Sequence, residues 1–308
     1  MSLFLSLFCV AALASDPWSE VASVAEMSVP EVQAMMAGVE RDQDILVRMA
    51  RPWEAKPWHQ YKTIFLTDSR VAGGVAFWEK HADQLKRVEE ETGVPAQLIV
   101  AILGVETKYG AIQGSDQVST ALYTLGFFHE RRGAFFRKEL GYYLKLATDE
   151  GWDVHGRLGS YAGAMGMGQF IPSSYVRYAV DGDGDGQRDL FENPNDAIAS
   201  VGNYFKAHGW RPGGPVLVPA QGAADALQAH HSKGLKPDTT RQSLEQVGIG
   251  GLEAMPADTA VKLLRFQEES DEDWRLALHN FYVITRYNHS ALYARAVWEL
   301  SERIAAER

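Results

Sequence analysis

The sequence predicts a mainly helical protein with a small β-containing insertion. Apolar residues recur at helical spacing through most of the chain, and strand-like segments are few and short. Of the 308 residues, 46% are hydrophobic and 11% are aromatic, so the chain can bury a substantial core in one large domain or two. A net charge of −10 argues against nucleic acid as a partner, because phosphates require a basic face.

Residues 1–14 predict a secretory signal peptide that is removed after Ala14. They contain an apolar run too short to span a bilayer, followed by the small-residue cleavage pattern Ala12-Leu13-Ala14. Phe8 precedes Cys9, the only cysteine, where a lipidated cysteine calls for a small residue, so lipoprotein anchoring is not expected. We therefore expect an exported, periplasmic protein that has no disulfide once the signal is removed.

Helical periodicity continues through most of the remaining chain. Between residues 37 and 65, prolines and aromatic residues predict an irregular connector rather than a regular element. The best strand candidates are short, at 216–218 and 246–249. The helices are expected at 18–25, 29–38, 71–92, 95–109, 119–128, 135–150, from 197 onward, and at 291–306.

The stretch GVETKYG places one carboxylate, Glu106, near the C-terminal end of a helix that the pattern predicts to be buried. Pro95 suits the first turn of this helix, and Gly110 is a stop signal. Apolar surroundings and the negative helix end both raise the pKa of Glu106, and a neutral acid at pH 7 can protonate a leaving oxygen. The alternative is a glutamate that pairs with Lys108 or another cation.

A second informative stretch, GSYAGAMGMGQFIPSSY, covers residues 159–175. Its glycines allow the backbone to approach a ligand closely. Ser160 and Gln169 offer uncharged hydrogen-bonding groups that suit hydroxyls and acetamides. The competing interpretation is tight helix packing through small residues.

The acidic stretch DGDGDGQRDLFE satisfies the EF-hand loop pattern. Asp181, Asp183 and Asp185 stand at positions 1, 3 and 5, glycine at position 6, and the carbonyl of Gln187 at position 7. Arg188 stands at position 8, where paired EF-hands usually carry an apolar residue, so an isolated loop is favoured over half of a calcium sensor. Calcium is the expected metal, and a solvated acidic turn is the alternative.

Three further residues remain open to two interpretations. Asp196 is either another metal ligand or the cap of the helix expected from Ala197. Tyr204 lies on that helix at a spacing that is more typical of core than of a site. After residue 280 an apolar run ends in Tyr287 and Asn288, which could line a sugar groove, or Asn288 could cap the final helix.

Several classes of enzyme have no support. The nine histidines do not have metal-ligand spacing, which disfavours a zinc hydrolase. The Gly-x-Ser-x-Gly and P-loop motifs are missing as well, so serine hydrolases and P-loop proteins are disfavoured. No organic cofactor is expected.

Taken together and in this order, these stretches resemble the B-type lytic murein transglycosylases, exported bacterial enzymes with a lysozyme-like catalytic core. The resemblance runs from Trp18 to about Leu300 and is carried by GVETKYG, GAMGMGQFIPSSY, DGDGDGQRDLF with DAIASVGNYFKAHGW, and FYVITRYN. It implies one transglycosylase domain, 15–308. Its expected parts are an additional N-terminal helical lobe 15–92, a catalytic core 93–212 with the calcium loop 181–196, a small β-containing insertion 213–270, and a C-terminal helical part 271–308 that completes the groove.

The resemblance implies cleavage of the β-1,4 bond between N-acetylmuramic acid and N-acetylglucosamine of peptidoglycan without water, which leaves a 1,6-anhydro-N-acetylmuramic acid end. It assigns Glu106 as the acid and then the base, and gives calcium a structural role. The implied glycan-binding residues are Ser160, Gln169, Tyr204, Tyr287, Asn288, Tyr293 and Tyr61, with Arg131 and Arg132 near the carboxylates of the peptide stems. The implied metal ligands are Asp181, Asp183, Asp185, Gln187 and Asp196.

Glu106 has no obvious carboxylate partner in the neighbouring motifs, whereas ordinary glycosidases use two carboxylates. A hydrolytic muramidase and a non-catalytic peptidoglycan-binding scaffold are the alternatives. The expected partners are peptidoglycan glycan strands, with proteins of a cell-wall synthesis or secretion complex as further candidates. A monomer is expected.

Overall fold

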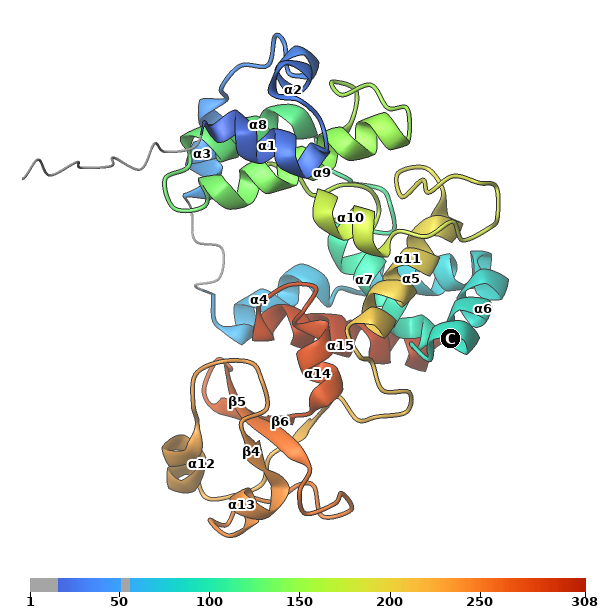
Figure 1. Cartoon of the computed structure of the whole chain (residues 1–308). Helices are drawn as coiled ribbons and strands as arrows, with labels where there is room; N and C mark the ends of the chain where they lie inside the picture. Colours follow the sequence, from blue (N-terminus) through green and yellow to red (C-terminus); the bar gives the residue numbers. More distant parts are fainter. Residues whose placement is uncertain (1–15, 51–55) are drawn as a thin grey trace, which may run out of the picture.

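The computed structural model describes residues 16–50 and 56–308, and the predicted signal peptide and Cys9 lie outside the described residues. Figure 1 shows a helical lobe at the top, a helical body in the centre and a sheet-containing unit below. The helices are α1 (Pro17–Ala25), α2 (Val29–Met35), α3 (Gln43–Met49), α4 (Trp58–Phe65), α5 (Asp68–Lys80), α6 (Ala82–Thr92), α7 (Ala96–Thr107), α8 (Val118–Phe128), α9 (Gly133–Asp149), α10 (Pro172–Tyr178), α11 (Pro194–Ala207), α12 (Ala224–His230), α13 (Arg241–Glu245), α14 (His279–Ile284) and α15 (Ala291–Glu307). The strands are β1 (Asp116–Gln117), β2 (Leu158–Gly159), β3 (Leu217–Pro219), β4 (Thr239–Thr240), β5 (Ala260–Gln267) and β6 (Glu272–Ala277).

Helix α7 lies at the centre of the helical body. Its run from Leu98 to Leu103 is fully buried, because neighbouring helices cover it on every side. It packs against α5, α6, α11 and α15. A helix that is apolar all round is stable only in such a position, and this burial sets the environment of its last turn.

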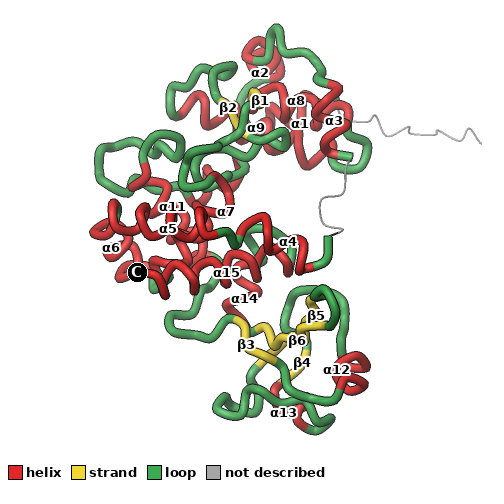
Figure 2. The backbone as a smooth tube through the Cα atoms, turned by 180° about the vertical axis from the view of Figure 1, so that it is seen from behind, coloured by secondary structure: helices red, strands yellow, loops and turns green. Residues whose placement is uncertain are grey.

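The upper lobe is built on the long helix α9, which packs against α1, α8 and α10. The unit below contains an antiparallel sheet in the order β3-β6-β5-β4. This sheet covers a small apolar core of its own, which includes Leu227, Leu244, Val261 and Leu276. In Figure 2 the strands are confined to this unit and to the short β1–β2 pair of the upper lobe.

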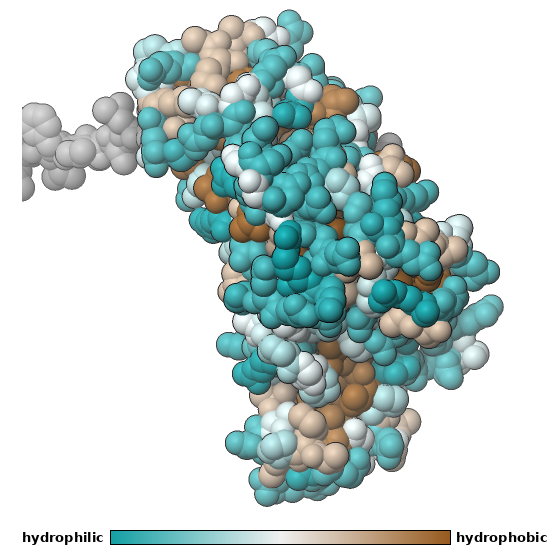
Figure 3. All heavy atoms as spheres, turned by 90° about the vertical axis from the view of Figure 1, so that its right-hand side faces the viewer, coloured by the Kyte–Doolittle hydropathy of each residue, from teal (hydrophilic) through white to brown (hydrophobic). Residues whose placement is uncertain are grey.

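The narrowing between the helical body and the sheet unit carries apolar surface, which is visible in the side view of Figure 3. No helix of the described residues is long and apolar enough to cross a membrane. The prediction of a mainly helical protein with a small β-containing insertion is confirmed, and so is a strand close to 216–218.

Some element predictions were wrong. The connector 37–65 contains two helices, α3 and α4. Asp42 caps α3 by accepting hydrogen bonds from the amides of Asp44 and Ile45, and Pro57 starts α4 rather than preventing it. The single helix expected at 71–92 is divided in two at His81, whose φ of −116° is not helical.

The strand predicted at 246–249 is a turn that follows α13, and the two longest strands, β5 and β6, were missed. Charged residues such as Lys262 and Arg265 interrupt the apolar run of β5 and obscured its pattern. Lys262 is nevertheless buried, because Asp238, Ser232 and a backbone carbonyl hold its ammonium group.

Candidate active site

Glu106 lies in the last turn of α7 and is half-buried. The Tyr293 hydroxyl of α15 donates a hydrogen bond to Glu106 Oε1 at 2.5 Å. Burial raises the pKa of Glu106 from its ordinary value of 4.5 to about 7, and this hydrogen bond acts in the opposite direction. Among the described residues Glu106 forms no ion pair, so the alternative of pairing with Lys108 is not supported.

Two further tyrosines, Tyr287 and Tyr204, continue from Tyr293 as an aromatic wall. The Tyr287 hydroxyl donates to the carbonyl of Gly168 at 2.6 Å, and the Tyr204 hydroxyl donates to the carbonyl of Arg286 at 2.6 Å. Burial raises the pKa of Tyr287 and of Tyr293, and the nearby Glu106 carboxylate adds to both shifts. The rings of Tyr204 and Tyr287 meet edge to face with centroids 4.8 Å apart, so Tyr204 belongs to the same aromatic wall.

The glycine-rich segment 159–170 is tied to the end of α7. The Thr107 hydroxyl donates to the carbonyl of Met167 at 2.8 Å and accepts from the amide of Gly110 at 2.9 Å. A Cβ atom at Gly168 would lie 3.0 Å from the Tyr287 hydroxyl, so this position favours glycine. The segment therefore lies beside the acid, as a ligand-binding loop requires.

Ser160 and Gln169 organise this loop from within. Ser160 Oγ accepts the amides of Ala162 at 3.3 Å and Ala164 at 3.0 Å. Gln169 has a positive φ of 50°, and its amide nitrogen donates to the carbonyls of Gln113 and Gly166, each at 3.0 Å. The Ser160 hydroxyl proton and the Gln169 side-chain oxygen remain as groups that a ligand can use.

The structure brings Tyr61 into the same region. This side chain of α4 is 7% exposed, and α4 packs against α15, the helix that carries Tyr293. Asn288 is exposed in the turn between α14 and α15. The last helix is capped by Ser290, whose Oγ accepts the amide of Tyr293, so the interpretation of Asn288 as a cap was wrong.

Arg131 and Arg132 lie in the exposed turn between α8 and α9. The guanidinium of Arg132 lies over the rings of Phe135 and Phe136, at 4.6 and 4.9 Å from their centroids. Among the described residues, Arg131 and Arg132 form no hydrogen bond or ring contact with Glu106 or with the aromatic wall.

The acidic loop has the chemistry of a cation site. Oxygens of Asp181, Asp183 and Asp196 lie within 4.8 Å of one another, while Asp185 is outside this cluster. The amides of Gly184 and Gly186 donate to Asp181 at 2.6 and 2.8 Å. Three converging carboxylates repel one another, so hard oxygen ligands in this arrangement suit a divalent cation such as calcium.

Asp196 links the acidic loop to the helical body. It is fully buried in the first turn of α11, and its two oxygens accept the amides of Gly182 and Asp189, each at 2.7 Å. Burial raises its pKa, and Asp183 and Asp181 add to the shift. The cap of α11 is Asn193, so the alternative role of Asp196 as a helix cap was wrong.

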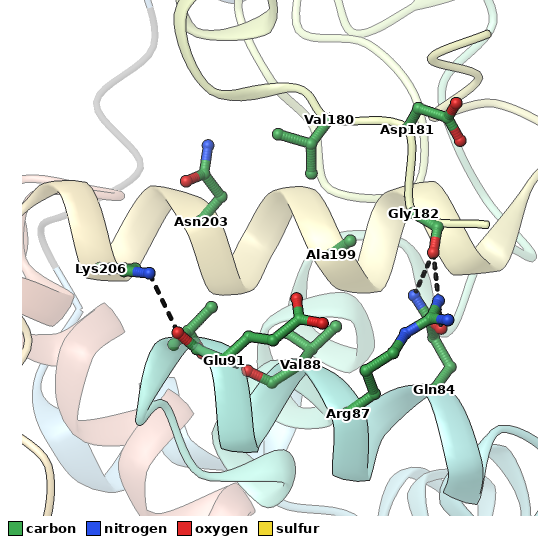
Figure 4. Close-up of a pocket in the computed structure, with 11 residues that line it drawn as sticks. Gln84, Arg87, Val88, Glu91, Val180, Asp181, Gly182, Ala199, Asn203 and Lys206 are labelled. Carbon is green, nitrogen blue, oxygen red and sulfur yellow. Dashed lines mark hydrogen bonds between the residues drawn. The ribbon is translucent and has the colours of Figure 1, made fainter. Parts of the chain in front are cut away.

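Helix α6 holds the same loop from the other side. In Figure 4, Gln84 and Arg87 both point to the carbonyl of Gly182. Gly182 lies between Asp181 and Asp183 in sequence. Gln84 also donates to the carbonyl of Asn195 at 3.2 Å. The loop is thereby fixed to α6 and α11, which both pack against α7.

Two residues that fix the end of α7 were missed from sequence. Thr107 follows Glu106 directly, but nothing in the local pattern showed that its hydroxyl would bind a backbone carbonyl 60 positions away. Tyr109 takes a left-handed conformation with φ of 62°, and its hydroxyl donates to the carbonyl of Arg70 at 2.6 Å. Its place before Gly110 was the only local signal.

A helical body in which the half-buried Glu106 lies beside an aromatic wall and a glycine-rich loop defines a lysozyme-like enzyme. The Transglycosylase SLT domain family matches residues 12–302. The chain therefore belongs to the B-type lytic transglycosylase family, and it is an enzyme of that class.

Individual relatives agree with this assignment. The chain is 44% identical over 254 residues to Membrane-bound lytic murein transglycosylase B of Escherichia coli (strain K12), covering 82% of this chain and 68% of the relative. Soluble lytic transglycosylase SltB1 of Pseudomonas aeruginosa is 42% identical with a TM-score of 0.88, covering 95% of this chain and 99% of that chain. Escherichia coli Slt35 in complex with calcium is 38% identical with a TM-score of 0.84, covering 95% and 92%.

Proposed function

We propose that this enzyme cleaves the β-1,4 bond between N-acetylmuramic acid and N-acetylglucosamine of peptidoglycan without consuming water. The observation that carries the proposal is the single carboxyl group of Glu106. Its pKa is raised to about 7, and the Tyr293 hydroxyl orients it. An acid of this kind is protonated in part at neutral pH, so it can donate a proton and later accept one.

The reaction needs only one carboxyl group if the substrate supplies the nucleophile. Glu106 donates its proton to the glycosidic oxygen as the bond from that oxygen to C1 of the muramic residue breaks, and the N-acetyl oxygen bonds to C1. The C6 hydroxyl oxygen then displaces the N-acetyl oxygen at C1, and its proton passes to the Glu106 carboxylate. The product is a 1,6-anhydro-N-acetylmuramic acid end, and the enzyme returns to its protonated state.

The surrounding residues suit a glycan strand. Tyr204, Tyr287 and Tyr293 provide an aromatic wall with fixed hydroxyl groups. Ser160, Gln169 and Asn288 offer hydrogen-bonding groups for hydroxyls and acetamides, and Tyr61 extends the wall toward α4. Arg131 and Arg132 are exposed guanidinium groups that would bind the carboxylates of peptide stems.

We assign a structural calcium ion to the acidic loop, with Asp181, Asp183, Asp185, the Gln187 carbonyl and Asp196 as its ligands. Bound calcium would neutralise the carboxylates that converge between α6 and α11. A relative's structure contains calcium, which supports this choice of metal. The loop residues hold the ends of two helices that pack on α7, so their role is to stabilise the fold around Glu106.

The proposed substrate places the enzyme in the periplasm, after export and removal of residues 1–14. The glycan strands of the wall are its proposed partners. Contacts with proteins of a cell-wall synthesis or secretion complex would bring the enzyme to places where peptidoglycan is remodelled.

Digestion of purified peptidoglycan by the mature protein and by Glu106→Gln tests this function. The glutamine keeps the shape and the hydrogen bond from Tyr293 but cannot deliver the proton, so we expect turnover to fall by about a thousandfold or more while binding to sacculi remains. Mass spectrometry of the released muropeptides should find ends that are lighter by one water than hydrolysed ends. Hydrated reducing ends would mean a muramidase, and binding without release by the wild type would mean a scaffold.

A further inference from the structure

The hairpin of β5 and β6 contacts two helices that carry groove tyrosines. Helix α4 carries Tyr61 and packs against β5, and α15 carries Tyr293 and packs against α4. Figure 1 shows α4 and α15 side by side above this hairpin. The contacts at this junction involve a buried cation, which is an unusual group to place in a core.

That cation is Arg295, two residues after Tyr293 and 3% exposed. Its Nη2 contacts Asp273 Oδ2 of β6 at 2.6 Å, and its Nε contacts Glu299 Oε1 of its own helix at 2.6 Å. Arg275 also binds Asp273, at 2.9 Å, so the carboxylate is held from both sides. One pair therefore joins α15 to the hairpin, and the other lies within α15.

The flat face of the Arg295 guanidinium lies on aromatic rings. Its central carbon is 4.3 Å from the ring centroid of Trp58 and 4.5 Å from that of Phe266. Phe266 is the cross-strand partner of Asp273, so the ring and the carboxylate meet Arg295 from one face of the hairpin. Trp58 in turn stacks on Tyr61, with centroids 6.4 Å apart.

A second ion pair fastens α4 to the hairpin, between Lys62 Nζ and Glu268 Oε2 at 2.6 Å. The Nη1 atom of Arg295 is buried and has no hydrogen-bond partner among the described residues. A buried ion pair contributes little to stability compared with apolar packing of the same volume, and an unpaired buried donor opposes stability. Orientation is the better explanation of this arrangement.

We propose that Arg295, anchored by Asp273 of the hairpin, is a positioning residue that holds Tyr293 against the Glu106 carboxyl group and, through Trp58, fixes the ring of Tyr61. The proposal rests on the proposed role of Glu106. It gives the hairpin a part in catalysis without contact with the substrate. Displacement of the first turn of α15 would lengthen the hydrogen bond from Tyr293 to Glu106, and misplacement by about 1 Å can reduce turnover by about a hundredfold.

The two carboxylates that bind Arg295 provide a matched pair of variants. Asp273 and Glu299 have similar side-chain exposure, 23% and 28%, and contact the same guanidinium. Asp273→Asn weakens the link between α15 and the hairpin, whereas Glu299→Gln weakens only a contact inside α15. A role limited to stability would lower the unfolding free energy of either variant without moving the pKa of Glu106.

The first measurement is the pH dependence of kcat on purified peptidoglycan, with Tyr293→Phe as the reference. The Tyr293 hydrogen bond lowers the pKa of Glu106, so its loss should move the alkaline limb to higher pH. We expect Asp273→Asn to reduce kcat about tenfold and to move the alkaline limb of the pH profile of kcat to higher pH. Glu299→Gln should keep the wild-type profile. A wild-type profile for Asp273→Asn, or equal shifts for both variants, would overturn the proposal.

A second measurement does not depend on turnover. The pH dependence of unfolding free energy is compared between each variant and the same variant carrying Glu106→Gln, which isolates the titration of Glu106. Asp273→Asn should raise the pKa of Glu106 obtained from this comparison, and Glu299→Gln should leave the pKa of Glu106 unchanged. If the wild type did not cleave peptidoglycan, the proposed function would be contradicted. The pKa of Glu106 measured by unfolding would still test the positioning role of Arg295.

If Asp273→Asn does not fold, Arg295→Lys replaces it in both measurements. Lysine keeps the buried charge but cannot bind two carboxylates as a planar fork or lie flat on Trp58. We expect the same direction of shift from this variant. An unchanged kcat profile together with an unchanged Glu106 titration would overturn the proposal.

Discussion

Glu106 owes its chemistry to its immediate surroundings rather than to a second carboxylate. Its one hydrogen-bond partner among the described side chains is the Tyr293 hydroxyl, at 2.5 Å. Burial opposes ionisation and raises the pKa to about 7, whereas a hydrogen bond from a neutral donor favours the carboxylate. The balance leaves an acid that can both donate and accept a proton near neutral pH.

The raised pKa predicts a pH-dependent loss of stability. Because the folded protein favours the protonated acid, the wild type should lose unfolding free energy as the pH rises from about 4.5, and the loss should be complete above pH 7. Glu106→Gln has no such titration and should be more stable than the wild type by about 3 kcal/mol at pH 8. Chemical denaturation at pH 4 and pH 8 measures the difference, and an equal effect at both values would contradict the assignment.

Tyr293→Phe tests the hydrogen bond alone. Without the hydroxyl, the pKa of Glu106 should rise further, and the alkaline limb of the rate profile should move to higher pH. Turnover at neutral pH should fall about tenfold, because the carboxyl group is no longer oriented. Tyr282→Phe on α14 is the control, since its hydroxyl forms no hydrogen bond with the described residues, and this variant should behave as the wild type.

At the scale of elements, the end of α7 and the glycine-rich loop act as one unit. The Thr107 hydroxyl contacts the carbonyls of Leu103 and Met167 and the amide of Gly110. It thereby joins the helix that carries the acid to the loop that carries Ser160 and Gln169. The hydrogen bonds of Thr107 therefore hold the end of α7 and the glycine-rich loop in a fixed position relative to each other, although the two segments are far apart in sequence.

Thr107→Val should separate these two segments. Valine has the same shape but leaves the Met167 carbonyl and the Gly110 amide without their partner, so we expect a loss of about 1–3 kcal/mol in unfolding free energy. Urea denaturation measures it. Thr120→Val is the control, because the Thr120 hydroxyl contacts only the exposed side chain of Gln117, at 3.2 Å. A comparable loss of unfolding free energy in Thr120→Val would contradict the role of Thr107 in joining the two segments.

The acidic loop should respond to calcium. After treatment with a chelator, added calcium should raise the melting temperature, because binding to the folded state stabilises it by about 2.7 kcal/mol at a hundred times Kd. Asp183→Asn should weaken this response, while Asp225→Asn on the exposed surface of α12 should not. No shift at millimolar calcium would exclude the loop as a metal site.

At the scale of the whole molecule, the acid lies where the helical body meets the segments that return from the sheet unit. Tyr287 and Tyr293 follow that unit in sequence, yet they complete the surroundings of Glu106. The hairpin contacts α4 and, through Arg295, α15. The sheet unit is thus connected to the site through side chains as well as through the backbone.

Export is a property of the whole chain and has its own test. Expression in a bacterial host followed by mass spectrometry of the periplasmic fraction should find a mature protein that begins at Ser15. Replacing Cys9 with serine should leave the product unchanged, because lipid attachment is not expected there. A membrane-bound product with a lipid-modified Cys9 would show that the predicted cleavage site is wrong.

Features that depend on the local order of residues could be predicted from the amino-acid sequence. The apolar run before Glu106 predicted a buried helix and a raised pKa of Glu106, and the structure has both. The spacing of Asp181, Asp183 and Asp185 predicted an EF-hand-like loop, and of these three the structure brings only Asp181 and Asp183 together. The same local reasoning failed between residues 37 and 65, where Pro57 starts a helix instead of excluding one. It failed again at β5, whose buried Lys262 depends on Asp238 of a separate segment.

Contacts between side chains that are distant in sequence became known only from the packing of the folded chain. Tyr293 reaches Glu106 across 187 positions, and Tyr287 reaches Gly168 across 119 positions. Asp196 proved to organise the acidic loop through two backbone amides, and Arg295 proved to join α15 to the hairpin. Periodicity and capping report the chain's nearest neighbours, whereas these contacts arise from the packing of distant elements, which no local pattern encodes.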